Sequence, residues 1–323
     1  LSLHDALPIS VFSAFKSCVN WFKRVASSLF WVVTTVAKKF CFIIGPTASG
    51  KSDFALLLAQ KIGAVIVNSD SQQIYCELPI LSASPTAADM ARVVHYLYGA
   101  LSGRVRCSAG MWLDMVLKLL PTIDRPVIFV GGTGLYLHTL LNGIAEVPDV
   151  TDETRQLVAT YSDKKLQELL GDKFNVNHRR NIRAAEVFVQ TGKHLKDWQA
   201  EQPEWMFKPS DFLITVMNVS RETIYEKINN RFTNMINAGA LDEVRELMKL
   251  NLDPALPIMT AHGVPELIKY IGGEISLQQA TEKAQQNVRN YAKRQLTWIR
   301  NQLPHKVMHD QITADDVKKF LNS

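Results

Sequence analysis

The chain has 323 residues, of which 47% are hydrophobic and 21% are charged, and its formal net charge at pH 7 is +5. This composition predicts a globular protein of one large or two modest domains and excludes a mainly disordered chain. The mild positive charge favours a polyanionic partner only slightly. The cysteines lie far apart, without the spacing of a zinc site or a disulfide framework, and they predict a reducing, cytoplasmic location. They are Cys18, Cys41, Cys76 and Cys107.

An apolar and aromatic leader occupies residues 1–38. Its longest run without a charge, from Val25 to Ala37, has 13 residues, which is shorter than the ~20 residues of a membrane-spanning helix. We therefore expect no membrane partner. We expect residues 1–38 to be a non-native or disordered leader, and the alternative is an amphipathic surface helix.

A glycine-rich loop follows the first buried-strand pattern, which lies at residues 40–44. The loop fits the phosphate-binding pattern G-x-x-x-x-G-K-[ST], and a helical stretch follows it. In such loops the backbone amides converge on phosphate oxygens at the positive end of a helix dipole. Lys51 adds a positive charge there, and the Ser52 hydroxyl is a ligand for Mg²⁺. The predicted phosphate-binding residues are Gly45, Pro46, Thr47, Ala48, Ser49, Gly50, Lys51 and Ser52.

Strand and helix patterns alternate along most of the chain. Further buried-strand patterns lie at 64–67, 126–130 and 212–217. The alternation predicts an α/β fold of the P-loop NTPase type, with a doubly wound parallel sheet. Between 145 and 208 the strand signal is absent, and we expect a helical insertion. The rest, residues 39–144 and 209–310, is predicted to form the catalytic core with its C-terminal helices. Helices are predicted at 135–141, 168–189, 221–238, 241–249, 264–270 and 276–303.

Asp70 follows the second strand pattern, and Gly131–Gly134 follow the third. Because ligands of parallel sheets bind at the carboxyl ends of the strands, we expect the phosphate loop, Asp70 and this glycine turn to line one crevice. Asp70 is a carboxylate that holds Mg²⁺, a general base beside the phosphates, or a residue of a helix cap or Asx turn. The glycine turn either lets the backbone bend or lets a ligand approach it closely.

Arg231 shares a predicted helix with Arg221 and Lys227. It is either a solvated surface charge or a second cation that closes on a phosphate group through its bidentate fork.

A second basic feature lies near the end of the chain. Between Lys283 and Lys306 there are six Lys or Arg and no acidic residue, and on a helical wheel Arg289, Lys293 and Arg300 fall on one side. This stripe suits an RNA backbone, and the alternative is an ordinary solvated face. Tyr291 and Trp298 lie off the stripe and are interpreted as core residues. Arg179, Arg180 and Arg183 form a second basic cluster with the same two interpretations.

Several segments together resemble one family, the bacterial tRNA dimethylallyltransferases, also called tRNA isopentenyltransferases. They occur in the family's order between residues 40 and 305, and the first and last are the most specific. These segments are residues 45–52, Asp70–Tyr75, Gly131–Tyr136, Arg180–Val187, the helix with Arg231 and Phe232, and Tyr291–Arg300.

The resemblance implies a reaction in which a dimethylallyl group passes from its diphosphate to N6 of adenosine 37 in tRNA, releasing pyrophosphate. It implies that Asp70 is the general base and that Lys51, Ser52 with Mg²⁺, and Arg231 stabilise charge on the leaving pyrophosphate. We expect a monomer whose insertion binds tRNA. The positions that match tRNA-contacting residues of the family are Asp70, Ser71, Gln72, Gln73, Thr133, Arg155, Arg179, Arg180, Arg183, Lys293, Arg294, Gln295 and Arg300.

The chain departs from the family pattern at a few positions. Cys76 and Ser84 stand where the family often has a basic residue, residues 260–265 lack flanking basic residues, and the insertion looks short. We expect these changes to weaken or redistribute tRNA contacts without changing the reaction. The alternatives are a P-loop nucleoside or nucleotide kinase, which needs no basic C-terminal helix, and a nucleotide-dependent RNA-binding module without chemistry.

Overall fold

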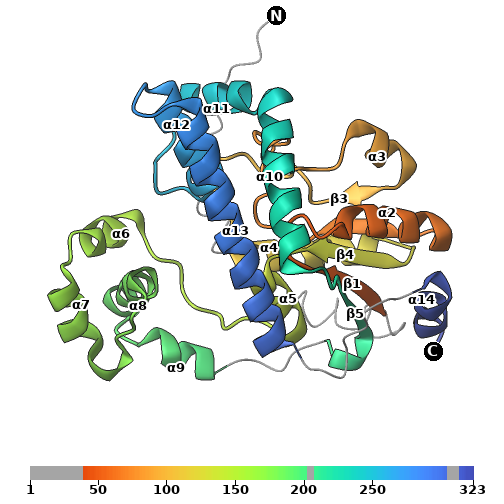
Figure 1. Ribbon diagram of the computed structural model, residues 1–323. Coiled ribbons are helices and arrows are strands. Elements are labelled where there is room, and N and C mark those ends of the chain that lie inside the picture. Colours follow the sequence, from red (N-terminus) through yellow and green to blue (C-terminus); the bar gives the residue numbers. More distant parts are fainter. Residues whose placement is uncertain (1–38, 202–206, 304–312) are drawn as a thin grey trace, which may run out of the picture.

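The computed structural model describes residues 39–201, 207–303 and 313–323, so the predicted leader 1–38 lies outside the described residues. A five-stranded sheet forms the centre, with its strands in the order β3-β2-β4-β1-β5 and all neighbours parallel (Figure 1). This confirms the predicted α/β class with a parallel sheet. The strands are β1 (Phe40–Ile44), β2 (Val65–Asn68), β3 (His95–Tyr96), β4 (Val127–Gly131) and β5 (Phe212–Val216).

Helices cover both faces of the sheet and extend beyond it. The α-helices are α2 (Lys51–Ile62), α3 (Ala87–Arg92), α4 (Ala109–Leu119), α5 (Gly134–Asn142), α6 (Asp152–Ala159), α7 (Asp163–Leu170), α8 (His178–Thr191), α9 (Leu195–Ala200), α10 (Arg221–Asn237), α11 (Ala240–Lys249), α12 (Val264–Ile271), α13 (Leu277–Gln302) and α14 (Ala314–Leu321). Short 3₁₀ helices lie at Leu120–Thr122, Gly171–Lys173, Pro209–Asp211 and Pro257–Thr260. No helix within the described ranges is both long enough and apolar enough to cross a membrane.

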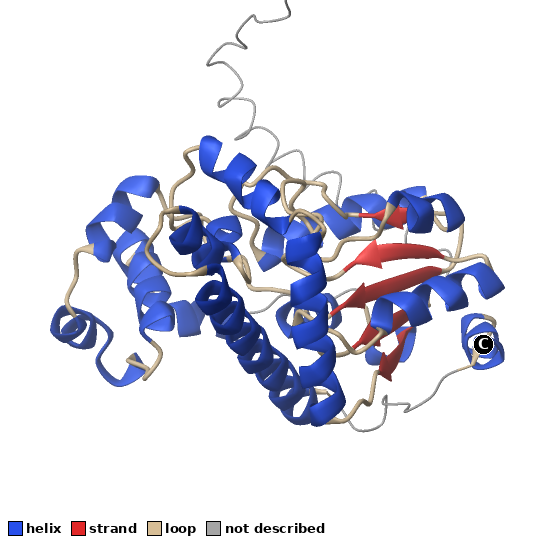
Figure 2. Ribbon diagram, turned by 45° about the horizontal axis from the view of Figure 1, so that its top comes forward, coloured by secondary structure: helices blue, strands red, loops and turns tan. Residues whose placement is uncertain are grey.

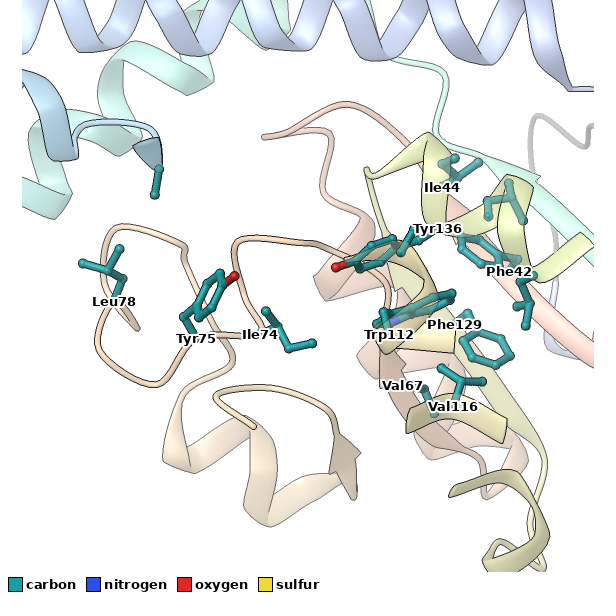
Figure 3. Close-up of a cluster of buried hydrophobic side chains, with 14 of the residues drawn as sticks. Phe42, Ile44, Val67, Ile74, Tyr75, Leu78, Trp112, Val116, Phe129 and Tyr136 are labelled. Carbon is teal, nitrogen blue, oxygen red and sulfur yellow. The ribbon is translucent and has the colours of Figure 1, made fainter. Parts of the chain in front are cut away.

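The two faces of the sheet belong to two separate clusters of buried side chains. Successive strand residues point to opposite faces, so Phe42 packs on one side and Cys41 and Ile43 on the other. The first side is the larger core, where Trp112 of α4 stacks on Tyr136 of α5 with ring centroids 4.4 Å apart (Figure 3). The second side is covered by α2 and by α14. Burial on both faces explains why the strands are almost continuously apolar.

The predicted helix at 168–189 is wrong, because the structure ends α7 at Leu170 and starts α8 at His178. Gly171 adopts a left-handed φ of 55°, which stops the first helix. Asn177 then caps the second, since its side chain accepts a hydrogen bond from the Arg180 amide at 3.2 Å. Strand β3 and helices α3, α4, α6, α9 and α14 were not predicted.

Helices α6, α7 and α8 pack around a small core of their own, beside the sheet (Figures 1 and 2). Val158, Leu166, Leu170 and Ala185 are its buried members. The predicted helical content of 145–208 agrees with this arrangement. The boundaries of the insertion and its role in binding tRNA stay predictions.

Helices α10 and α13 lie side by side and cross the edge of the sheet where the strands end (Figure 2). Ile224 and Ile228 of α10 pack on Ala292 of α13. Because parallel strands end at this edge, the long helix pair is placed against the loops that sequence analysis singled out.

Candidate functional site

The phosphate-binding loop joins β1 to α2 as predicted. Ala48 and Gly50 adopt left-handed φ angles of 63° and 85°, which turn the chain sharply into the helix. Lys51 opens the helix and is only 8% exposed, with its Nζ 3.4 Å from the Pro46 carbonyl oxygen. Burial lowers the pKa of Lys51 from 10.5 to about 8. The Ser49 hydroxyl is buried in the loop without a hydrogen-bond partner among the described residues, which fits a cradle built for a ligand that supplies oxygens.

Asp70 lies at the carboxyl end of β2 in an Asx turn, in which its Oδ1 accepts a hydrogen bond from the Gln72 amide at 3.0 Å. The Asn68 side chain fixes this turn by accepting from the Asp70 amide at 2.7 Å. The same carboxylate lines a pocket beside the phosphate loop. Asp70 therefore forms a turn, and its position at the pocket also allows it to act on a ligand bound beside the phosphate loop.

The pocket opens between the phosphate loop, the Asp70 turn, α10 and α13, and it encloses about 550 Å³ including its open mouth. Its lining is mixed: Thr47, Asp70, Gln72 and Arg231 are among the polar residues, and Leu81, Ile228, Phe232, Met235 and Val288 are apolar. The lining residues are Thr47, Asp70, Gln72, Leu81, Ser82, Ile228, Arg231, Phe232, Met235, His262, Val288 and Tyr291.

Two cations, the buried Lys51 and the half-buried Arg231, lie in the site beside Asp70. Arg231 lines the pocket and is half-buried, which contradicts its interpretation as a solvated surface charge. Burial lowers the pKa of Arg231, whereas the negative charge of Asp70 raises it. Lys51 is affected by the charges of both Asp70 and Arg231. Asp53, which is exposed, also acts on Arg231, so Asp70 is the one carboxylate that acts on both cations. An additional anion would be favourable here, because incompletely compensated buried charges are unfavourable.

His262 and Tyr291 are pocket residues that sequence reasoning missed. His262 lines the pocket, and the next residue, Gly263, has a left-handed φ of 94° and packs closely on Phe232, which also lines it. The imidazole lies against the Tyr291 ring, with centroids 4.5 Å apart, and burial lowers the pKa of His262 to about 4. The interpretation of Tyr291 as a core residue is therefore incomplete. No sequence signal pointed to His262.

The glycine turn after β4 is packed by protein atoms, which favours the backbone-bending alternative over a close ligand approach. A Cβ on Gly131 would lie 2.0 Å from the Ser69 carbonyl oxygen, and one on Gly134 would lie 2.3 Å from the Trp298 ring. Thr133 Oγ1 accepts a hydrogen bond from the Ser71 amide at 3.0 Å. The glycines thus let the loops at the carboxyl ends of β2 and β4 touch each other and α13.

We expect Gly131→Ala to lower the free energy of unfolding by about 1–3 kcal/mol, the usual range for overpacking. The clash is with backbone, which has little freedom to yield. Gly110→Ala is the matched control, because its Cβ would meet only Ser108 Oγ, at 3.7 Å. Urea unfolding of both variants measures the difference, and equal stabilities would contradict the close approach.

The predicted tRNA-contacting residues divide into four groups. Arg179 and Arg180 are exposed on α8, whereas Arg155 and Arg183 pair with the buried Glu186 at 3.8 and 3.4 Å. On α13, Lys293, Arg294 and Arg300 are exposed, while Arg289 Nη1 is bound to Asn229 Oδ1 of α10 at 2.5 Å. Gln73 and Gln295 are buried, and their side-chain amides bind protein backbone. Of the remaining four, Asp70 and Gln72 line the pocket, and Ser71, between them in sequence, is hydrogen-bonded to Thr133.

The residues present fit a magnesium ion only if the substrate shares in holding it. The described residues contain no group of three His, Cys, Asp or Glu side chains arranged for a metal. Ser52 is exposed at the start of α2, beside the loop. Mg²⁺ commonly takes few protein ligands and completes its shell with phosphate oxygens and water, which this site allows.

Comparison with known proteins agrees with these observations. The family model "IPP transferase" matches residues 73–302, and the model "Isopentenyl transferase" matches residues 38–101. Two curated relatives, both called tRNA dimethylallyltransferase, come from Bradyrhizobium sp. (strain ORS 278) and Bartonella quintana (strain Toulouse). They are 43% identical over 281 residues and 44% identical over 273 residues, and the matches cover 82% and 80% of this chain and 91% and 92% of theirs.

A solved structure from Staphylococcus epidermidis, described as a tRNA delta(2)-isopentenylpyrophosphate transferase, superimposes with a TM-score of 0.61. It is 31% identical in sequence, and the match covers 88% of this chain and 99% of that one. The family match spans most of the chain, including the phosphate loop, the Asp70 turn, α10 and α13. The chain therefore belongs to the tRNA dimethylallyltransferase (IPP transferase) family.

Proposed function

We propose that the protein transfers a dimethylallyl group from dimethylallyl diphosphate to N6 of adenosine 37 in tRNA. The observation that carries this proposal is the composition of the pocket, whose lining combines the polar Thr47, Asp70 and Arg231 with the apolar Leu81, Ile228, Phe232, Met235 and Val288. Dimethylallyl diphosphate has a charged diphosphate end, which suits the polar lining residues, and a short hydrocarbon end, which suits the apolar ones. Family membership favours this transferase over the kinase alternative.

The proposed reaction breaks the bond between C1 of the allyl group and the diphosphate oxygen and forms a bond between C1 and N6. The N6 proton passes to the Asp70 carboxylate, and pyrophosphate leaves. The adenine amine is a poor nucleophile because its lone pair is delocalised, so a positioned base contributes about 10²–10⁴-fold. Lys51 and Arg231 compensate the charge that grows on the leaving pyrophosphate.

Magnesium fits this proposal as a bound ion shared with the substrate. Ser52, together with the diphosphate oxygens, would hold it. The ion would neutralise part of the charge on the leaving group.

The target adenosine must leave its stack to reach the pocket, as in other enzymes that modify bases. We propose that Lys293 and Arg294, exposed on α13 near Tyr291, contact the tRNA backbone. Arg294 lies over the Tyr291 ring at 5.7 Å, so the basic surface reaches the pocket wall. The expected monomer and cytoplasmic location stay predictions.

We expect Lys293→Ala and Arg294→Ala each to reduce the salt dependence of tRNA binding, lowering the slope of log K against log salt by about 1. Each variant removes one proposed phosphate contact. The affinity for an anticodon stem-loop, measured from low to moderate salt, gives the slope. Lys249→Ala on α11 is the control, because this exposed lysine pairs with Glu246 on its own helix. Slopes equal to that of the wild type would show that this part of α13 is an ordinary solvated face.

The direct test offers the enzyme labelled dimethylallyl diphosphate, Mg²⁺ and an anticodon stem-loop with adenosine at position 37. We expect label in the RNA, and none when guanosine replaces that adenosine. Absence of label from the RNA together with turnover of ATP would contradict the proposal and favour the kinase.

A further inference from the structure

Four residues of α13 match tRNA-contacting positions of the family, namely Lys293, Arg294, Gln295 and Arg300. Of these four, Gln295 alone is buried, with 5% of its surface exposed. Its side chain lies between two loops that are far apart in sequence. Oε1 accepts a hydrogen bond from the Thr47 amide at 2.9 Å, and Nε2 donates to the Gly132 carbonyl oxygen at 2.9 Å. One planar amide thus joins the phosphate loop to the glycine turn after β4.

The Gln295 side chain is tightly packed against Gly132 and the phosphate loop. A Cβ on Gly132 would lie 2.1 Å from Gln295 Nε2 and 3.0 Å from the Gly45 carbonyl oxygen. Gly132 is therefore small because Gln295 and the phosphate loop pack directly on it. The contact is more than a by-product of helix packing, since both polar ends of the side-chain amide are satisfied by backbone groups of the two loops.

The contact also occupies one of the amides of the phosphate loop. The Thr47 N–H is already bound to Gln295, while the Thr47 residue lines the pocket. A phosphate loop depends on several amides held in one orientation, and preorganised donors are effective because they need no rearrangement when charge develops. Fixing Thr47 from outside the loop restricts the backbone between Gly45 and Gly50.

We propose that Gln295 is a positioning residue that holds the phosphate loop in its diphosphate-binding conformation, and that it acts through Thr47 and Gly132 and not through contact with tRNA. This inference rests on the proposed function for its substrate, dimethylallyl diphosphate. It goes beyond that function because it assigns one residue of the basic helix to the phosphate end of the site.

The test uses Gln295→Met, which keeps the length of the side chain and removes both strong hydrogen bonds. We expect pyrophosphate to bind about tenfold more weakly, since two bonds to the loops are lost. KM for dimethylallyl diphosphate should rise by a similar factor, while KM for tRNA and the salt slope of tRNA binding stay within about twofold of the wild type. The reverse split, weaker tRNA binding with unchanged pyrophosphate binding, would overturn the proposal.

Gln285→Met is the matched control. Gln285 is a half-buried glutamine on the same helix that donates to the Asn229 carbonyl oxygen of α10 at 3.1 Å, and the wall of the pocket does not include it. Its loss should leave the pyrophosphate affinity unchanged. If both variants lost pyrophosphate affinity equally, the loss would come from any lost side-chain hydrogen bond of α13. That result would overturn a specific role of Gln295.

A measurement on the wild type serves if Gln295→Met does not fold. With ¹⁵N-labelled threonine, the Thr47 amide should exchange slowly before pyrophosphate is added, because Gln295 already binds it. Fast exchange in the unliganded enzyme would overturn the proposal. Neither pyrophosphate binding nor amide exchange depends on transfer, so a wild type that fails to prenylate RNA would contradict the proposed function and leave this inference standing.

Discussion

Replacing Asp70 by asparagine is expected to slow prenyl transfer by about 10²–10⁴-fold, the contribution that a general base commonly makes. Asparagine keeps an Oδ1 that can accept the hydrogen bond from the Gln72 amide, so the Asx turn persists. It has no basic oxygen for the N6 proton. Single-turnover transfer to the anticodon stem-loop measures the chemical step.

Pyrophosphate binding separates this effect from damage to the site. The Asp70→Asn substitution removes a negative charge beside Lys51 and Arg231, both of which interact with Asp70, so pyrophosphate should bind at least as tightly as in the wild type. Asp70→Ala is the comparison, since it loses both the base and the turn, and the lost hydrogen bond should lower stability by about 0.5–1.5 kcal/mol. Transfer at the wild-type rate in Asp70→Asn would leave Asp70 as a turn residue only.

Much of the site could be predicted because its parts follow strands. The phosphate loop has a fixed pattern, and Asp70 and the Gly131 turn lie at the carboxyl ends of apolar runs that form β2 and β4. In a parallel sheet those ends meet at one edge. Local sequence therefore predicted four of the strands, and each predicted strand end lies within one residue of the observed end.

The opposite wall could not be predicted because helix packing creates it. Nothing near His262 in sequence indicates a pocket, and the loop that carries it packs on Phe232 of α10 through Gly263.

The burial of Gln295, in contrast, was indicated by the sequence. Tyr291, Gln295 and Trp298 follow the i, i+4, i+7 spacing of a buried helix face, and all three are at least half-buried. Because glutamine is polar, the sequence analysis did not assign it to that face.

Lys51→Met is expected to slow transfer strongly and yet to stabilise the unliganded protein. Lys51 supplies charge to the leaving pyrophosphate, and loss of one such group commonly reduces rates by about 10²–10³-fold. Its burial lowers the pKa from 10.5 to about 8, which corresponds to roughly 3 kcal/mol against the charged form. Methionine fills the same space without a charge, so we expect a gain of about 1–3 kcal/mol in the free energy of unfolding near pH 7.

The pH dependence gives this gain a signature. Below pH 8 the wild type folds with a charged Lys51, and the advantage of methionine is complete. As the pH rises from about 8 toward 10.5, the folded protein releases this proton before the unfolded chain does, so the advantage shrinks. Melting temperatures of both proteins at pH 7 and pH 10 measure the change. Lys61→Met is the control, because Lys61 is an exposed lysine of the same helix.

Saturating pyrophosphate should make the wild type more stable than Lys51→Met, because it stabilises only the protein that binds it. A variant that is less stable than the wild type at pH 7 would mean that Lys51 is held by compensating contacts, and that the site is not built around an anion brought by the substrate.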